Sequence, residues 1–224
     1  IGEKAPKAQP DLRPGEIVIK DINGYARDKN NQPIVDENGR FVLTGEPDGI
    51  IDDADNVLLG SQDPGWLAGI TNTLRYKDFD LSIQFNGMFD RRMQDPTEMA
   101  YGLGGGDLAR YGYNALRKIK DRWTWDNPST TQPTSFNGWN NNYTSGDWYY
   151  QKAWFIRLTN ISLGWTLPRT LISRTKVLSR VRLSLSASNL FCITPYKGLD
   201  PETDYYAAAY PNARTYSMGI NVTF

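Results

Sequence analysis

The sequence predicts an all-β fold of the transmembrane antiparallel β-barrel class, with about five strands belonging to a larger barrel. Three observations lead to this prediction. Apolar and polar residues alternate over five segments, each near the roughly 9–11 residues with which a tilted strand crosses a bilayer. The connections between these segments are alternately short and long. Finally, the sequence has no apolar run of the roughly 18 residues that a membrane helix needs.

The first two predicted strands are residues 66–76 and 79–89. In the second, Phe79 and Leu81 alternate with Asp80 and Ser82, and the pattern continues to residue 89. Successive side chains of a strand point to opposite faces, so one face is apolar and the other polar. Only residues 77–78 separate the two strands, which predicts a tight hairpin.

The third predicted strand, residues 155–167, changes phase along its length. Ile156 and Leu158 lie on one phase, whereas Ile161 and Leu163 lie on the other. This change predicts a β-bulge near residues 159–160. Residues 181–191 give the fourth strand, in which Val181 to Ala187 alternate with Arg182 to Ser188, and residues 214–224 give the fifth, which alternates throughout and ends on an aromatic residue.

The connections predict which end of each strand faces the cell exterior. They contain 2, 64, 13 and 22 residues in chain order, and 65 residues precede the first strand. Membrane barrels have short periplasmic turns and longer outer loops. We therefore expect an extracellular loop region at 1–65, C-terminal barrel strands within 66–224, and outer loops at 90–153 and 192–213. A soluble β-sandwich gives no reason for this sorting.

Five strands cannot close a membrane barrel, since the smallest have about eight. An open sheet edge is not tolerated in hydrocarbon. The outermost strands are therefore expected to pair with polypeptide that is not in this chain. The alternative is a soluble carbohydrate-binding β-sandwich, in which the apolar faces would meet a second sheet.

Composition excludes several classes of function. The 25 basic and 25 acidic residues leave no net charge, so no global field attracts nucleic acid. The sequence has no histidine and no nucleophile elbow, and we therefore expect no enzyme. The single cysteine, Cys192, cannot form an internal disulfide. Arg75, Asp80, Gln84 and Arg182 fall on polar strand faces, where they could touch plug or substrate or pair with one another.

Several motifs occur in one order along the chain. Residues 14–17 (PGEI) and 20–24 (KDING) precede 48–55 (DGIIDDAD), and 122–128 (RWTWDNP) lies in the longest loop. They are followed by residues 155–168 (FIRLTNISLGWTLP), 188–191 (SNLF), 196–202 (YKGLDPE) and 210–216 (YPNARTY). In their order and spacing these motifs resemble the C-terminal part of SusC/RagA-type TonB-dependent transporters.

The resemblance implies a barrel of about 22 strands that is large enough to be plugged. It implies a multi-pass protein of the bacterial outer membrane that imports oligosaccharides, as in glycan uptake, or peptides. The implied partners are membrane lipid, the remaining barrel and plug, a SusD-like surface lipoprotein and TonB, which would act through the missing N-terminal part.

An acidic motif predicts a calcium site. Asp21 and Asn23, followed by Asp48, Asp52 and Asp55, read as an EF-hand-like loop divided by the insertion 25–47. Calcium takes six to eight oxygen ligands, and these side chains supply them. The insertion contains its own candidates, Asp28, Asn30, Asp36 and Asn38. The alternative is a solvated acidic loop that forms Asx turns.

Aromatic residues in the 90–153 loop predict a ligand or lid contact. They are Trp123, Trp125, Trp139, Trp148, Tyr149 and Tyr150, and they stand among Asn, Ser, Thr and Gly residues. Exposed rings can stack on sugars, and aromatic residues are also enriched in protein interfaces. The alternative is that the rings form a small core of the loop itself or mark the membrane interface.

Overall fold

The computed structural model describes residues 7–102, 112, 114–129, 131–134, 146–175, 177–203 and 209–224. The chain divides into two compact units. One consists of Ile1–Leu59 and Pro96–Tyr149, and the other of Gly60–Asp95 and Tyr150–Phe224. Part of the long 90–153 loop therefore folds with the N-terminal region, although the first two strands separate them in sequence.

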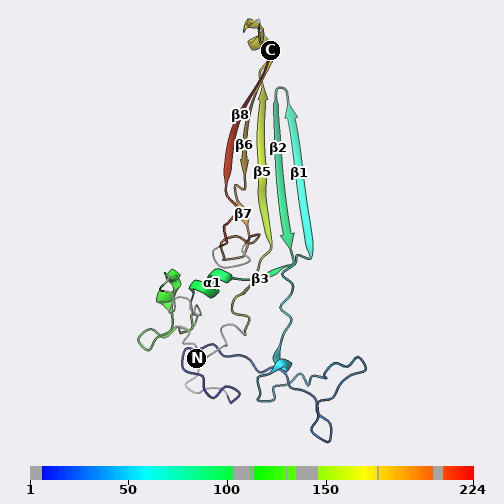
Figure 1. Cartoon of the computed structure of the whole chain (residues 1–224), viewed down its shortest axis with the longest axis vertical. Coiled ribbons are helices and arrows are strands. Elements are labelled where there is room, and N and C mark those ends of the chain that lie inside the picture. The colour runs from blue at the N-terminus through cyan, green and yellow to red at the C-terminus, as the bar shows by residue number, and fades with distance from the viewer. Residues whose placement is uncertain are drawn as a thin grey trace. The chain divides into compact units, whose positions relative to one another are not determined.

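The second unit is an antiparallel sheet of long strands (Figure 1). Its order is β1 (Trp66–Tyr76), β2 (Phe79–Phe89), β5 (Phe155–Thr166), β6 (Arg180–Ser188) and β8 (Thr215–Thr223), and the short β7 (Cys192–Ile193) also pairs with β5. Among the described residues, β1 and β8 each pair on one side only. The predicted all-β antiparallel fold with five long strands is confirmed.

The hairpin and the bulge both occur at the predicted positions. Lys77 has a φ of 53° in the two-residue turn between β1 and β2. Between β2 and β5 the register shifts, because Gln84 lies opposite Asn160 while Phe85 lies opposite Leu158. Thr159 is the extra residue, and its Oγ1 donates a hydrogen bond of 3.1 Å to the carbonyl oxygen of Gln84.

The fourth strand is shorter than predicted. β6 ends at Ser188 because Asn189 adopts a φ of 54° and its side chain donates to the Ala213 carbonyl at 3.0 Å. The connection between β5 and β6 contains α4 (Arg169–Ile172) and η3 (Ser173–Thr175). A second, two-stranded sheet pairs β3 (Arg92–Gln94) with β4 (Tyr150–Lys152), next to a small core of Met93, Ala153 and Tyr196.

The first unit has little regular structure. It contains η1 (Asp53–Asp55), α1 (Pro96–Tyr101) and η2 (Arg117–Asp121), and isolated bridges connect its extended segments. Its apolar cluster is centred on the buried Tyr149 and includes Ile17, Met99, Ile119 and Trp148. No helix in the described parts of the chain has the length and apolar character needed to cross a membrane.

Candidate functional site

The two faces of the long sheet differ in chemistry. Because residues opposite one another on antiparallel strands share a face, the register joins the apolar residues of all five strands into continuous rows. One row contains Leu74, Leu81, Leu163, Leu185 and Met218. Four of these side chains are between 42% and 77% exposed, so within the described structure a large apolar face is uncovered.

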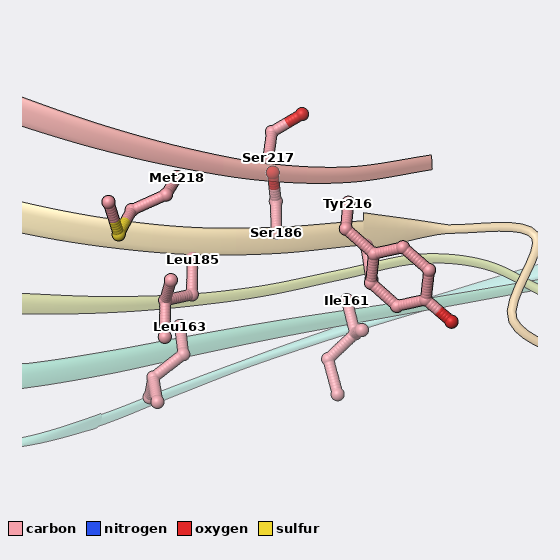
Figure 2. Close-up of a pocket in the computed structure, with 8 residues that line it drawn as sticks. Ile161, Leu163, Leu185, Ser186, Tyr216, Ser217 and Met218 are labelled. Carbon is pink, nitrogen blue, oxygen red and sulfur yellow. The ribbon is translucent and has the colours of Figure 1, made fainter. Parts of the chain in front are cut away.

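A shallow hollow of about 420 Å³ lies on this face. It is lined mainly by Ile161, Leu163, Leu185, Ala187, Tyr216 and Met218. Figure 2 shows the large labelled side chains (Ile161, Leu163, Leu185, Tyr216 and Met218) on one side of the strands and Ser186 and Ser217 on the other. The alternation predicted from the sequence therefore separates the side chains of these strands as expected.

The opposite face carries uncharged hydroxyl groups. Thr73, Ser82, Ser162, Ser186 and Ser217 stand in one row across five strands. Hydroxyls donate and accept hydrogen bonds without carrying charge. This row can therefore meet water or a polar ligand, but it cannot lie against hydrocarbon without cost.

One ion pair crosses this polar face. Arg182 of β6 reaches over β5 and contacts both carboxylate oxygens of Asp80 in β2, each at 2.7 Å. The residue between them is Gly164, where an added Cβ would lie 2.4 Å from an Arg182 nitrogen and 2.7 Å from Asp80 oxygens. The absence of a side chain at Gly164 is therefore what lets the two charges meet. The sequence left open whether Asp80 and Arg182 touch plug or substrate or pair with one another, and the structure shows them paired.

At the end of the sheet near β7, the polar face carries buried charges that sequence reasoning missed. Arg157 is 4% exposed, and its Nη2 lies 2.5 Å from Asp200 Oδ1. Its Nε lies 3.2 Å from Glu202 Oε2. The sequence contained only an indirect sign of these ion pairs, because Asp200 and Glu202 both belong to the YKGLDPE motif of residues 196–202.

In the first unit, the carboxylates predicted to bind calcium accept backbone hydrogen bonds. Asp21 accepts from the N–H groups of Asp48 and Gly49, and Asp55 accepts from those of Ile22, Asn23 and Asp52. Asp52 caps η1 through the N–H of Ala54. Desolvation acts to raise the pKa of Asp55, but the three backbone donors outweigh it and hold that pKa below its ordinary value.

These hydrogen bonds bring the two halves of the acidic motif together across the insertion. Among the described residues, no group of three or more His, Cys, Asp or Glu side chains is arranged to hold a metal ion. Asp48 and Asp52 make the local contacts of an Asx turn and a cap, whereas Asp21 and Asp55 accept from N–H groups 27 to 33 residues away. Calcium binding stays a prediction.

The insertion 25–47 contains two turns of the same design. Asp28 Oδ1 accepts from the N–H groups of Asn30 and Gln32, and Asp36 Oδ1 accepts from those of Asn38 and Arg40. All four distances are 2.8–2.9 Å. The acidic residues of the insertion therefore shape its backbone.

The aromatic residues of the long loop take different roles. Trp123 is 9% exposed and lies against Gly15, whereas Trp125 is 78% exposed and meets Trp123 edge to face, with 5.1 Å between ring centroids. Trp148 packs on the buried Tyr149 in the core of the first unit. Tyr150 is 39% exposed in β4 of the second unit. Trp139 lies outside the described residues.

A short turn holds the exposed indole in place. The backbone groups of Thr124 and Asn127 exchange two hydrogen bonds of 3.1 Å, which leaves Trp125 and Asp126 at the tip. The Asn127 side chain also donates to the Arg122 carbonyl. Of the described rings in the predicted contact set, Trp125 is by far the most available to a ligand or partner.

Comparison with known proteins gives consistent relatives, although no protein-family model matches. The chain is 28% identical over 203 residues to TonB-dependent receptor P3 of Formosa agariphila, which covers 84% of this chain and 19% of that protein. It is 27% identical over 199 residues to TonB-dependent receptor SusC of Bacteroides thetaiotaomicron, covering 86% of this chain and 19% of that receptor. The chain thus spans about a fifth of the length of these relatives.

A solved structure of the RagAB peptide transporter is also similar. It matches with a TM-score of 0.60 and 26% sequence identity, over 91% of this chain and 22% of that one. The resemblance predicted from the motifs is therefore confirmed: the chain is similar over most of its length to part of the SusC/RagA-type TonB-dependent receptors, and its sheet has the architecture of a partial β-barrel.

Proposed function

We propose that this chain forms part of the wall and the outer loops of a TonB-dependent importer in a bacterial outer membrane. The observation that carries the proposal is the sheet with one apolar and one hydroxyl-rich face. In a membrane barrel the apolar face meets lipid and the polar face lines the lumen. The five long strands contain 9–12 residues each, which suits a tilted crossing.

A soluble β-sandwich fits this sheet less well. In a sandwich the apolar face would be covered by a second sheet about 10 Å away. Within the described residues of the second unit, the only other sheet is the short pair β3 and β4. The exposed apolar rows and the two unpaired edges both support a wall that continues into further strands.

The remaining parts of the transporter follow from the resemblance. We infer that the missing strands close the barrel, that a plug fills it, and that TonB supplies the energy through that plug. We further infer that a SusD-like lipoprotein covers the outer loops and that the chain takes part in transport, not in catalysis. The support is that the relatives are named as receptors and transporters.

The proposed substrates are oligosaccharides or peptides. The polar face supports this class because its hydroxyl and amide groups suit neutral, hydrogen-bonding ligands. One similar structure is described as a peptide transporter, whereas SusC is named only as a receptor. The relatives therefore support import by a TonB-dependent system more strongly than either substrate.

Adjacent residues of β6 provide a matched test. Leu185→Arg places a charge on the apolar face, where it should cost about 2–4 kcal/mol at the bilayer midplane. Ser186→Arg places the same charge on the polar face and should be tolerated. We would express the native polypeptide that carries this chain, fractionate the membranes, and compare the mobility of boiled and unboiled samples.

The expected result is a detergent-extracted, heat-modifiable protein for the unmodified sequence and for Ser186→Arg, with little for Leu185→Arg. Recovery of the unmodified protein in the aqueous fraction would contradict the membrane assignment. Equal tolerance of both substitutions in the membrane would contradict the assignment of the two faces.

A further inference from the structure

Side chains on the polar phase are buried at the end of the sheet that carries β7. Phe155 and Arg157 lie on this phase, opposite Met88 and Asn86, and are only 1% and 4% exposed. On the apolar phase at the same end burial is mixed, since Leu158 is 6% exposed and Ile193 is 54% exposed. A segment of the same unit must therefore cover the polar face here.

The covering segment is residues 194–203. Thr194 Oγ1 donates to the Trp154 carbonyl at 2.8 Å, and Tyr196, 6% exposed, packs with Met93 and Ala153. The N–H of Lys197 donates to Gln151 Oε1 at 3.0 Å. The contacts come from side chains and from backbone groups, so the segment is fixed along its length.

Two buried arginines hold the far end of the segment. Arg157 pairs with Asp200 and Glu202, as described above, and Arg91 Nη1 donates to the Pro201 carbonyl at 3.1 Å. Arg91 is itself 4% exposed. The guanidinium groups of Arg91 and Arg157 therefore bind three consecutive residues, 200–202, and we call this arrangement the arginine clamp.

The carboxylate of Asp200 also accepts hydrogen bonds from within the segment and from Asn212 beyond it. Its Oδ1 accepts from the N–H of Glu202 at 2.9 Å, and its Oδ2 accepts from the N–H of Asn212 at 3.0 Å. The Asn212 side chain donates to Glu202 Oε2 at 2.9 Å. Charge-assisted hydrogen bonds are stronger than neutral ones, so the clamp fixes the shape of this segment as well as its position.

We propose that residues 194–203 form an inward-folded loop that narrows the mouth of the translocation path, and that the arginine clamp holds it there and thereby limits the size of substrate admitted. This inference rests on the proposed function, because the polar face is the lumen wall only in a barrel. The loop does not project away from the sheet into solvent. Arg91 and Arg157 act as positioning residues, since their partners belong to the loop.

Cys192 provides a probe of the clamp. It lies opposite Arg157 in the register, on the polar phase, and is half-buried. Burial raises the pKa of its thiol, although Arg157 opposes this effect. A substitution in the clamp therefore changes both the fraction of Cys192 that is thiolate and the access of a labelling reagent to its sulfur. The ratio of labelling rates with two maleimides of different size removes the first effect, because both react with the same thiolate.

The experiment uses the native full-length polypeptide with Cys192 as its sole cysteine, purified in detergent. We would measure labelling by N-ethylmaleimide and by a bulky poly(ethylene glycol) maleimide. For Asp200→Asn with Glu202→Gln, we expect the bulky-to-small ratio to rise about tenfold, which corresponds to about 1.4 kcal/mol. Asp80→Asn is the matched control, since it removes a polar-face charge that no contact joins to the loop, and its ratio should stay unchanged.

An unchanged ratio in the double variant, with the heat-modifiable mobility retained, would overturn the proposal. A bulky-to-small labelling ratio near one in the unmodified protein would also overturn the proposal, because the loop would then not restrict access to the Cys192 thiol. If the double variant fails to fold, Glu202→Gln alone replaces it, since Glu202 is 37% exposed at its side chain and its loss leaves the buried pair intact. A smaller rise in the ratio is then expected, and no rise contradicts the clamp.

Uptake of a length-graded series of oligosaccharides and of peptides by cells gives the functional readout. Release of the clamp should extend import to longer members of whichever series is transported. Failure of both series with the unmodified protein would count against the proposed function alone. Unchanged length limits with normal import would count against the narrowing of the path alone.

Discussion

At the scale of single residues, Gly164 has a role that its neighbours define. Its Cα faces the Asp80–Arg182 pair, and any Cβ would displace one of the two charges. Glycine is usually a weak choice in a strand, because it packs nothing and loses entropy on folding. Here the missing side chain permits a bidentate ion pair over a neighbouring strand.

We predict that Gly164→Val separates Asp80 from Arg182 and lowers stability by about 1 kcal/mol, the upper range for a partly exposed ion pair. The temperature at which the unboiled, fast-migrating band disappears would measure this. Gly69→Val is the control, since the nearest atom to an added Cβ there is 3.5 Å away, an ordinary contact. Equal effects at both glycines would show that the ion pair contributes nothing.

The two neighbouring tryptophans of the long loop should behave differently. Trp123→Ala removes a buried ring and should cost about 3–5 kcal/mol of stability. Trp125→Ala removes an exposed ring and should change stability by less than about 0.5 kcal/mol, while weakening binding of a lid protein or substrate. Thermal unfolding and binding of the copurifying partner would be measured for both variants. Unchanged binding after loss of Trp125 would remove it from the contact set.

Calcium binding can be tested at the acidic loop. If Asp21, Asn23, Asp48, Asp52 and Asp55 hold the ion, calcium should raise the melting temperature, because a ligand that binds only the native state stabilises it. Asp52→Ala should abolish the gain, whereas Asp28→Ala in the insertion should keep it. No shift with the unmodified protein would end the prediction and leave these carboxylates as caps of the backbone.

At the scale of elements, the bulge in β5 sets which side chains face which way. Thr159 is the extra residue, and it reverses the phase between residues 155–158 and 160–166. If Thr159 were instead paired in register without a bulge, Arg157 would fall on the apolar face and Ile156 on the polar face. A one-residue shift of register moves a whole set of side chains to the wrong side of a sheet.

Deletion of Thr159 should be tolerated, because Leu158 would then precede Asn160 in regular alternation and every other residue of β5 would keep its partner and its face. Thr159→Ala should also have a small effect, about 1 kcal/mol, for loss of one hydrogen bond. The amount of heat-modifiable protein in the membrane fraction measures both variants. Loss of assembly in the deletion variant would mean that the sheet needs the bulge itself, and not only the placement of side chains on the two faces.

At the scale of the whole molecule, the two units are stabilised by different kinds of interaction. The sheet is a repeated local pattern, because each strand alternates and each antiparallel neighbour preserves the alternation. The first unit has few regular elements, and its extended segments depend on carboxylates that accept backbone N–H groups. In many proteins, binding residues lie on loops that a rigid scaffold positions.

The sequence alone was sufficient for the five long strands, apart from the early end of the fourth at Ser188, and for the hairpin and the bulge. Alternation has a period of two residues, and a phase change within one strand can be seen without knowledge of its partner. It was also sufficient for the resemblance, which rests on short motifs in a fixed order. The roles of the charged and aromatic residues were left as alternatives, because a side chain's partners cannot be deduced from its own segment.

Only the tertiary structure decided those roles. Arg182 meets Asp80 across 102 positions, and Arg157 meets Asp200 across 43. It assigned Trp123 and Tyr149 to packing and left Trp125 exposed. Such contacts depend on strand register and on how loops return to the sheet, which are set by the sum of many distant interactions. Local periodicity determines the strands of this chain and the chemistry of their two faces, whereas long-range pairing determines the arginine clamp and which tryptophan of the long loop stays exposed.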